Sequence, residues 1–311
     1  MKIGILSYYP GNKRPSIEET RLLKSAREMG HKARIIRVSN CQLVFDGVMP
    51  YVLLDEKKFP HFDLVIPRVH VLKSVDLHTS ILHQLELMGI PTVNSAVSIS
   101  HAKNKLYTMQ ILSHHSIAIP RTMVIRSQKY LDGAIKDVGG FPVIVKTPFG
   151  SYGSGVVIAE SKRSLVSALD ALWSAYNINI VLIQQYIRES KGRDIRVFVT
   201  GGKVVATMMR AASRGEFRSN IELGGNGEPV EITPEEADLA IRATEILGLE
   251  VSGVDLVRSK RGPLILEVNA NPGFKKLEEV TGVNVARAII EYAVSKVEKQ
   301  QPTTSSLSLT R

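Results

Sequence analysis

The segment Ser252–Gly273, SGVDLVRSKRGPLILEVNANPG, holds two runs of alternating apolar residues on either side of Lys260-Arg261-Gly262. Alternation with a period of two is typical of a β-strand that buries one face. Gly262 suits the left-handed last position of a three-residue hairpin loop. The segment therefore predicts an antiparallel hairpin centred on Arg261.

This hairpin places two carboxylates opposite each other. Its cross-strand pairs are Gly253–Asn269, Val254–Val268, Asp255–Glu267, Leu256–Leu266 and Val257–Ile265. Opposed Cβ atoms lie roughly 4.5–5.5 Å apart, so Asp255 and Glu267 repel each other unless a cation lies between them. Asn269 follows on the same face, and two carboxylates with an amide oxygen are the hard ligands that Mg²⁺ prefers. We expect a metal site at these three residues; the alternative is a solvated hairpin whose acidic residues face water.

A second informative segment is VIVKTPFGSYGSGVV, in which Lys146 ends an apolar strand and Gly150, Gly153 and Gly155 follow in a loop. A Walker A loop has its lysine after the glycines and opens a helix, so this segment is not one. A glycine-rich hairpin loop can instead close over phosphates with its backbone N–H groups, while the strand lysine holds their charge. The alternative is an ordinary hairpin tip.

Charged residues recur in QQYIRESKGRDIRVFV and RAASRGEFRSN. Asp194 and Arg196 lie on one face of a predicted strand, where Asp194 could bind ribose hydroxyls and Arg196 a phosphate or a substrate carboxylate. Arg210, Arg214 and Arg218 follow around a glycine break, and arginine forks match phosphate and carboxylate oxygens. The alternatives are a plain ion pair and a basic loop.

Outside these segments, the first hundred residues alternate between strand and helix patterns. Strands are predicted at Lys2–Ser7, Ala33–Val38 and Leu64–Ile66, and helices at Glu18–Met29 and Val75–Met88, which argues for a small parallel sheet. Another helix is predicted from about Ile99 through Leu112, and later ones at Ser164–Tyr176, Pro234–Leu247 and Val285–Glu298. The strands of the later two thirds predict antiparallel α+β lobes.

Composition limits the function classes. The chain has 311 residues, 44% of them apolar, and 40 Lys and Arg against 30 Asp and Glu, a net charge of +10 that favours anionic partners. No stretch approaches the roughly 18 apolar residues of a membrane helix, and the N-terminus has no signal-peptide layout. The one cysteine, Cys41, fits a reducing compartment. We therefore expect a cytoplasmic protein with no membrane partner.

The order of these motifs resembles the ATP-grasp superfamily. The residues that carry the resemblance are Lys146 with its glycine loop, Gln-Gln-Tyr-Ile at 184–187, Asp194-Ile-Arg196, Arg218-Ser-Asn220, Asp255 and Glu267-x-Asn269-x-Asn-Pro-Gly. Within the superfamily the chain is similar to the RimK branch, ATP-dependent ligases that add glutamate to the C-terminus of a ribosomal protein. The likeness runs from Met1 to about Val297.

The resemblance implies an α/β and α+β architecture, the ATP-grasp fold: a small parallel-sheet N-terminal domain and two antiparallel α+β lobes that enclose ATP. The implied boundaries are residues 1–98 for the N-terminal domain, 99–188 for the central lobe with the glycine lid, and 189–298 for the C-terminal lobe with the metal hairpin. Residues 299–311 are expected to form a disordered tail.

The resemblance also implies a role for each motif. ATP would be bound by Lys105, Lys146, Gln185, Tyr186, Asp194, Arg218, Ser219 and Asn220, with Lys146 and Arg218 also catalytic. Asp255, Glu267 and Asn269 would hold two Mg²⁺ or Mn²⁺ ions. Arg196, Arg210 and Arg214 are the candidates for substrate binding. Gln185 stands where the family usually has glutamate.

The implied reaction joins L-glutamate to the C-terminal carboxylate of a ribosomal or other protein or peptide through an acyl phosphate. The implied partners are L-glutamate, an acidic protein or peptide C-terminus and further copies of the chain in a homo-oligomer. The first alternative is a glutamate ligase that acts on a small-molecule cofactor or a dipeptide. A phosphotransferase and an RNA-binding or ribosome-binding module are alternatives from other classes.

Overall fold

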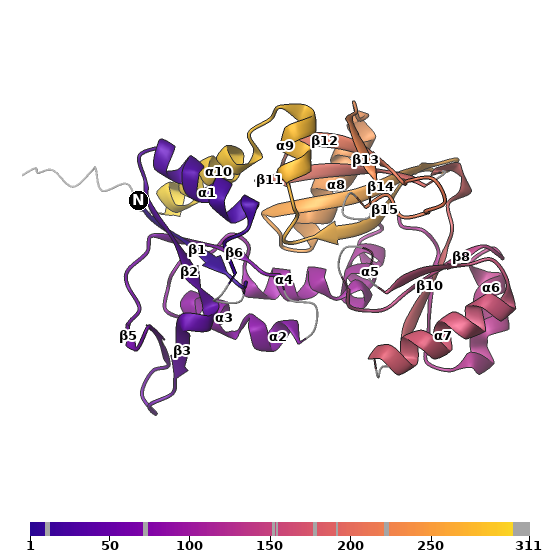
Figure 1. Ribbon diagram of the computed structural model, residues 1–311, viewed down its shortest axis with the longest axis horizontal. Coiled ribbons are helices and arrows are strands. Elements are labelled where there is room, and N and C mark those ends of the chain that lie inside the picture. Colours follow the sequence, from indigo (N-terminus) through magenta and orange to yellow (C-terminus); the bar gives the residue numbers. More distant parts are fainter. Residues whose placement is uncertain are drawn as a thin grey trace, which may run out of the picture. The chain divides into compact units, whose positions relative to one another are not determined.

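The computed structural model describes residues 1–9, 13–70, 74–150, 153, 155–176, 179–190, 192–220 and 224–300. The chain divides into two compact units (Figure 1). The first comprises Met1–His70, Ser80–Ser95 and Asn284–Arg311, and the second comprises Val71–Thr79 and Ala96–Val283. The chain after Asn284 thus returns to the N-terminal unit, which differs from the division at residues 98, 188 and 298. None of the described helices has the length and apolar run needed to cross a membrane.

The first unit is built on a three-stranded parallel sheet. Its strands are β1 (Lys2–Ser7), β2 (Lys32–Arg37) and β6 (Leu64–Arg68), in the order β2-β1-β6. The central strand β1 is buried except at its first residue, because it has a neighbour on each side. The parallel sheet predicted from the sequence is therefore confirmed.

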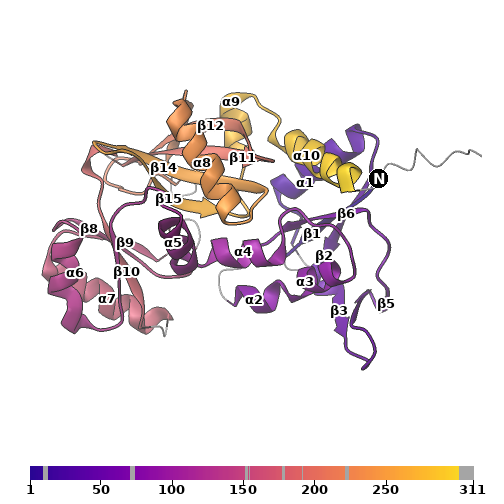
Figure 2. The ribbon, with the colours of Figure 1, turned by 180° about the vertical axis from the view of Figure 1, so that it is seen from behind.

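Helices and a small antiparallel sheet complete this unit. The helices are α1 (Ile17–Glu28), α3 (Ser80–Leu87) and α10 (Val285–Gln300); the small sheet consists of β3 (Cys41–Val44), β4 (Tyr51–Leu54) and β5 (Lys57–Lys58), after a 3₁₀ turn at Val38–Asn40. A capping box of Ser16 and Glu19 begins α1, and its buried face includes Leu22 and Ala26. Helix α10 packs against α1 (Figures 1 and 2).

The single helix predicted at Val75–Met88 is wrong, because the structure has two helices there. Helix α2 (Val75–His78) ends at Thr79, and α3 begins at Ser80. The Thr79 hydroxyl donates to the Val75 carbonyl at 2.9 Å, a side-chain bond to the preceding turn that often bends helices.

The helix predicted from about Ile99 is likewise divided. Helix α4 (Ala96–Lys103) and helix α5 (Lys105–His114) are separated by Asn104. Asn104 is the N-cap of α5, and its side chain accepts hydrogen bonds from the N–H groups of Leu106 and Tyr107. Because α5 starts afresh after this cap, Lys105 lies in its first turn.

The second unit contains a four-stranded antiparallel sheet in the order β7-β10-β8-β9. Its strands are β7 (Thr122–Ile125), β8 (Val143–Lys146), β9 (Val156–Ala159) and β10 (Val181–Gln185); a 3₁₀ turn at Gln128–Tyr130 leads into α6 (Leu131–Asp137), and α7 (Lys162–Tyr176) follows β9. Val143 and Val145 pack in one apolar cluster with α6 and α7. Since side chains alternate along a strand, Ile144 and Lys146 lie on the opposite face.

A five-stranded antiparallel sheet, ordered β13-β12-β11-β14-β15, forms the other part of this unit. Its strands are β11 (Arg193–Thr200), β12 (Lys203–Ala211), β13 (Asn226–Pro229), β14 (Val251–Ser259) and β15 (Gly262–Asn269), preceded by a 3₁₀ turn at Arg188–Ser190. Helix α8 (Pro234–Ile246) packs against the sheet, and α9 (Lys275–Thr281) contacts β12 and β13 (Figure 2). A capping box of Thr233 and Glu236 begins α8, with Pro234 in its first turn.

The β14–β15 hairpin confirms part of the predicted register and corrects the rest. The pairs Gly253–Asn269, Val254–Val268 and Asp255–Glu267 are present, but Leu256 pairs with Ile265 and Val257 with Leu264. The turn is therefore two residues long, Lys260-Arg261, and the Ser259 hydroxyl donates to the Gly262 carbonyl at 2.8 Å across it. Leu266 is the extra residue of a β-bulge, and this insertion restores the predicted register at the carboxylates.

Candidate active site

One cavity in the second unit collects most of the predicted site residues. It lies between the face of the four-stranded sheet that carries Lys146 and the strands β11, β12, β14 and β15. Eleven predicted residues line it: Lys105, Lys146, Gln185, Tyr186, Asp194, Arg210, Arg218, Ser219, Asn220, Asp255 and Glu267. Arg196 donates to the lining residue Asp255, and Asn269 follows the lining residue Glu267 by two positions on β15. Arg214 is exposed in a turn and does not line the cavity.

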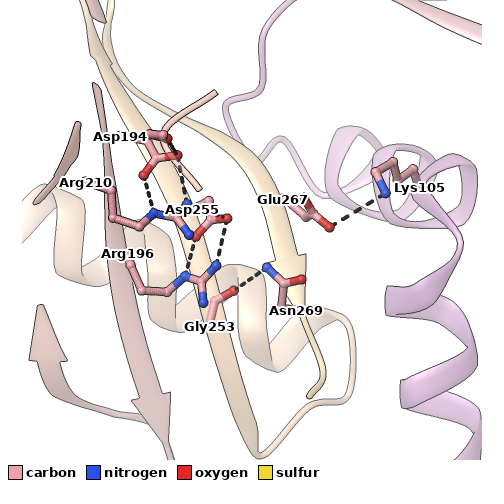
Figure 3. Close-up of polar contacts among 9 residues, drawn as sticks. Lys105, Asp194, Arg196, Arg210, Gly253, Asp255, Glu267 and Asn269 are labelled. Carbon is pink, nitrogen blue, oxygen red and sulfur yellow. Dashed lines mark hydrogen bonds and ion pairs between the residues drawn. The ribbon is translucent and has the colours of Figure 1, made fainter. Parts of the chain in front are cut away.

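The predicted metal ligands lie side by side on the hairpin (Figure 3). Asp255 is 5% exposed and pairs directly across the sheet with Glu267, a side chain that is 33% exposed. The Asn269 amide nitrogen donates to the Gly253 carbonyl at 3.3 Å, which leaves the amide oxygen directed away from that bond. Within the described ranges no three His, Cys, Asp or Glu side chains gather around one point, because the third predicted ligand is an amide.

Asp255 belongs to a network of four charged residues on three adjacent strands, Asp194, Arg196, Arg210 and Asp255, here termed the buried charge network (Figure 3). Arg210 donates from Nε and Nη2 to the two carboxylate oxygens of Asp194 at 2.7 and 2.8 Å. Its Nη2 also lies 2.8 Å from Asp255 Oδ2. Arg196 donates to the Asp255 carboxylate at 3.0 Å. Carboxylates and guanidiniums therefore alternate in the order Asp194, Arg210, Asp255, Arg196.

Burial and pairing oppose each other in this network. Burial alone would raise the pKa of the Asp255 carboxyl, but the charges of Arg196 and Arg210 outweigh it and hold that pKa below its ordinary value. Burial likewise disfavours the Arg210 guanidinium, yet Asp194 and Asp255 raise its pKa. Asp255 and Arg210 are therefore both charged at neutral pH, and the Asp255 carboxylate is held in one orientation by its two arginines.

Two lysines enter the cavity from different elements. The pKa of Lys146 is lowered to about 8, because burial and the charge of Lys105 outweigh the opposite effect of Glu267 and the other nearby carboxylates. The Lys105 Nζ lies 3.0 Å from the Gly150 carbonyl oxygen and 3.7 Å from Glu267 Oε1. Lys105 thus joins the glycine loop to the metal hairpin.

The glycine loop is tied to its surroundings at both ends. The Lys105 N–H donates to the Pro148 carbonyl at 2.9 Å, and the Thr147 N–H donates to the Gly155 carbonyl at 3.0 Å. Gly155 has φ +73°, and a Cβ there would lie 2.2 Å from the Thr147 hydroxyl, so only glycine fits. Ser151, Tyr152 and Ser154, which the lid prediction includes, lie outside the described residues.

The predicted adenine-binding strand ends at Gln185. Its N–H donates to the Arg121 carbonyl at 2.8 Å, and its side-chain oxygen accepts from Arg261 Nη2 at 3.0 Å. Because the arginine can only donate, it fixes which end of the amide faces it. The Gln185 amide nitrogen is therefore directed elsewhere.

Comparison with known proteins agrees with this geometry. A RimK PreATP-grasp domain model matches residues 1–99, and a RimK-like ATP-grasp domain model matches residues 102–293. A probable alpha-L-glutamate ligase 2 of Shewanella amazonensis is 41% identical over 293 residues, which cover 94% of this chain and 95% of that protein. The chain belongs to the RimK-like ATP-grasp family.

Solved structures show the same fold. A RimK domain ATP-grasp protein from Sphaerobacter thermophilus aligns with a TM-score of 0.72 at 22% identity, over 94% of this chain and all of that one. The ATP-grasp ligase PsnB, complexed with a minimal precursor, Mg and ADP, aligns with a TM-score of 0.72 at 17% identity, over 95% of this chain and 98% of that one. The predicted ATP-grasp fold and the predicted class, an ATP-dependent ligase, are confirmed, and the RimK-like family uses ATP and Mg²⁺.

In this RimK-like chain, Glu216 is a residue beside the candidate site that the sequence did not single out. Glu216 accepts from Arg218 Nε at 3.1 Å and from Arg218 Nη2 at 2.7 Å, and these bonds lower the pKa of Glu216 to about 2. Arg218 Nη1 also donates to the Gly153 carbonyl at 3.1 Å. The only sequence signal was an acid two positions before the arginine, a spacing too common to single out.

Proposed function

We propose that this protein is an ATP-dependent ligase that joins L-glutamate to the C-terminal carboxylate of a protein or peptide. The observation that carries the proposal is the cavity in which Asp255 and Glu267 face each other beside Lys105, Lys146 and Arg218. Two acidic oxygen donors among three cations suit a metal–nucleotide polyphosphate. A relative named as a probable alpha-L-glutamate ligase over nearly the whole length supports glutamate as the amine substrate.

The nucleotide is assigned to the residues that line the cavity. Lys105 and Lys146 hold the phosphates, the backbone of Gln185 and Tyr186 faces the adenine, and Asp194 accepts hydrogen bonds from the ribose. Arg218, Ser219 and Asn220 lie at the phosphates and at the carboxylate that reacts. Arg218 is paired with Glu216 and Lys105 with Glu267, so these two cations exchange partners when phosphates enter.

The ligand set fits the divalent cations of this family. Asp255 and Glu267 supply carboxylate oxygens and Asn269 an amide oxygen, all hard donors of the kind that Mg²⁺ and Mn²⁺ take. We assign two ions to these residues. Bound there, they would neutralise phosphate charge and polarise the transferred group.

The reaction proceeds in two steps. An oxygen of the acceptor carboxylate attacks the γ-phosphorus of ATP, forming an acyl phosphate and releasing ADP. The glutamate amine then attacks the acyl carbon, an amide forms, and phosphate leaves with the bonding electrons while the amine loses a proton. Lys146 and Arg218 stabilise charge that develops on the phosphoryl oxygens, and the glycine loop excludes water that would hydrolyse the acyl phosphate.

A peptide acceptor is favoured over a small molecule. The chain carries a net charge of +10, which suits an acidic tail, and the fold neighbour PsnB is complexed with a minimal precursor. A ribosomal protein with an acidic C-terminus is the acceptor we propose.

The test measures phosphate release by the purified chain with ATP and Mg²⁺, each L-amino acid in turn, and an acidic peptide with a free C-terminus. We expect release that requires both glutamate and the peptide, and mass spectrometry should locate the new residue at the C-terminus. The same peptide with an amidated C-terminus is the control and should be inert. Hydroxylamine should trap the acyl phosphate when glutamate is omitted.

Two outcomes would contradict the proposal. ADP formation with a stable phosphorylated acceptor would indicate a phosphotransferase. Glutamate addition to a pterin, a flavin-type cofactor or a dipeptide, with the acidic peptide inert, would indicate the small-molecule alternative. Light scattering of the same preparation tests the homo-oligomer that we expect.

A further inference from the structure

A concave basic surface lies in the first unit, outside the candidate active site. We term it the basic groove, because six of its nine lining residues are basic: Lys2, Arg27, His31, Lys32, Arg34 and His61. They come from the last turn of α1, the starts of β1 and β2, and the segment before β6. The groove has a volume of about 460 Å³. It lies at the amino ends of the parallel strands.

Its cations are exposed and lack acidic partners. Lys2, Arg27, Lys32 and Arg34 are all exposed, and within the described ranges none of them forms an ion pair. Two acids lie near the groove: Asp63 accepts from the Lys2 N–H at 2.6 Å and pairs with His61 at 3.0 Å, and the charge of Glu298 acts on His31. The four cations repel each other and outnumber these two acids, so the groove keeps a net positive field.

The groove is held in shape by backbone contacts between its segments. The Lys32 N–H donates to the Met1 carbonyl and the Asp63 N–H to the Lys2 carbonyl, each at 2.9 Å. Arg27 Nη2 donates to the Ala33 carbonyl at 3.2 Å, and the Arg34 guanidinium lies 5.9 Å from the centre of the Phe62 ring. These contacts position the guanidiniums without neutralising them, so an anion would meet cations already in place.

We propose that the basic groove binds an acidic peptide, specifically a run of glutamate side chains on the acceptor or on the elongated product. The identity of this peptide rests on the proposed function. Lysine, arginine and histidine side chains match carboxylates. Single-stranded nucleic acid is disfavoured as the ligand, because proteins that bind it stack the bases on exposed aromatic side chains. Phe62, the phenylalanine that lines the groove, is only 4% exposed.

The test is equilibrium binding without catalysis. A fluorescein-labelled octaglutamate with an amidated C-terminus, which cannot be ligated, is titrated with the full chain in the absence of ATP, and anisotropy is recorded. The variant Lys32→Glu/Arg34→Glu should bind about tenfold more weakly, because two attractive charges become repulsive. The matched control is Lys57→Glu/Lys58→Glu, which makes the same charge change at two exposed residues of β5 in the same unit and should change the affinity less than about twofold.

The outcomes separate this inference from the proposed function. Both variants should melt like the parent chain and, with the acidic acceptor peptide at saturating concentration, still ligate glutamate to it at the parent's rate. Equal weakening in the two variants would overturn the groove as a site, since only net charge would then matter. Tighter binding of an RNA oligonucleotide of equal charge, lost in the groove variant, would also overturn it. A chain that binds octaglutamate through the groove but releases no phosphate with glutamate would contradict the proposed function alone.

Discussion

In the second unit, Arg196 pairs with Asp255 and Arg210 lies between Asp194 and Asp255, whereas in the first unit Lys32 and Arg34 are exposed. The paired guanidiniums are 11% and 5% exposed. Within the described residues the two groove cations form no ion pair. Basic side chains therefore occupy two different environments in one chain.

Solvent accounts for the difference. A buried charge is tolerable only when it is paired, and pairing fixes its position. An exposed charge costs little without a partner and attracts anions over about 8–10 Å, a range that salt shortens. The network consequently suits the fixed orientation of the Asp194 and Asp255 carboxylates, and the groove suits the capture that we propose of an acidic chain.

The largest effect is expected at the metal hairpin. Asp255→Asn and Glu267→Gln should each lower glutamate-dependent phosphate release about 1,000-fold, since each removes a charged ligand. Their stabilities should differ, because Asp255 is buried against two arginines while Glu267 is partly exposed. Thermal melting should fall clearly for Asp255→Asn and stay nearly unchanged for Glu267→Gln. Ordinary turnover by the Glu267→Gln chain would remove Glu267 from the metal site.

The next largest effect tests the pairing itself. Arg210→Ala should lower the free energy of unfolding by about 3–5 kcal/mol, because Asp194 and Asp255 lose a buried partner. The matched control is Arg287→Ala, which breaks an exposed pair with Glu291 and should cost about 0.2–1 kcal/mol. Urea denaturation measures both. Similar losses would show that burial does not separate the two kinds of arginine.

Much of the fold could be predicted from local patterns. The capping box of Thr233 and Glu236 and the strand alternation around Asp255 depend on residues close in sequence. The hairpin tip could not be predicted in the same way. A two-residue turn with a bulge at Leu266 and a three-residue loop without one give the same pairing at the carboxylates, so the alternation pattern does not distinguish them.

The site was predicted as a set of residues but not as a set of contacts. Strand alternation places Asp194 and Arg196 on one face, yet each pairs with a residue on a different adjacent strand. Such partners depend on the register between β11, β12 and β14, which no short segment contains. Thus the sequence indicated which residues gather, whereas only the sheet shows that Arg196 and Arg210 orient carboxylates.

A glycine tests how closely the network is packed. Gly253 has no Cβ, and one placed there would lie 2.7 Å from Pro272 Cβ and 3.2 Å from Arg196 Cδ. Gly253→Ala should therefore displace Arg196 from Asp255 and cost about 1–3 kcal/mol. A Cβ added to Gly133 in α6 would meet no atom within 4 Å, and Gly133→Ala should be stabilising by about 0.5–1 kcal/mol. The melting temperature should fall for Gly253→Ala and rise for Gly133→Ala. A rise in both variants would mean that Arg196 can move away from the added methyl group without cost.

A smaller effect should appear with pH. The pKa of Lys146 is lowered to about 8 by burial, so its charged fraction falls about threefold between pH 7.5 and 8.5. ATP affinity measured at equilibrium should fall to a similar extent, and Lys146→Arg should remove this dependence. In the unfolded chain the pKa of Lys146 is 10.5, so between about pH 8 and 10.5 the unfolded chain binds more protons at this residue than the folded chain does. Lys146 therefore makes the folded chain more stable as the pH rises from about 8 to 10.5. A flat affinity profile in the parent chain would place Lys146 away from the phosphates.

The smallest effect is expected at Arg214, a cation that belongs to neither region. Arg214 is exposed in a turn that is closed by the Glu216 N–H, which donates to the Ser213 carbonyl at 2.9 Å. It is not among the residues that line the cavity of the second unit. Arg214→Ala should change ATP affinity, unfolding free energy and octaglutamate binding only slightly, less than about twofold or ~0.5 kcal/mol. The measurement sharpens the comparison, because it removes one positive charge without touching the network or the groove. A loss of octaglutamate binding as large as that of Lys32→Glu/Arg34→Glu would mean that acidic chains also meet the protein at this turn, in the substrate-binding role that the sequence predicts for Arg214.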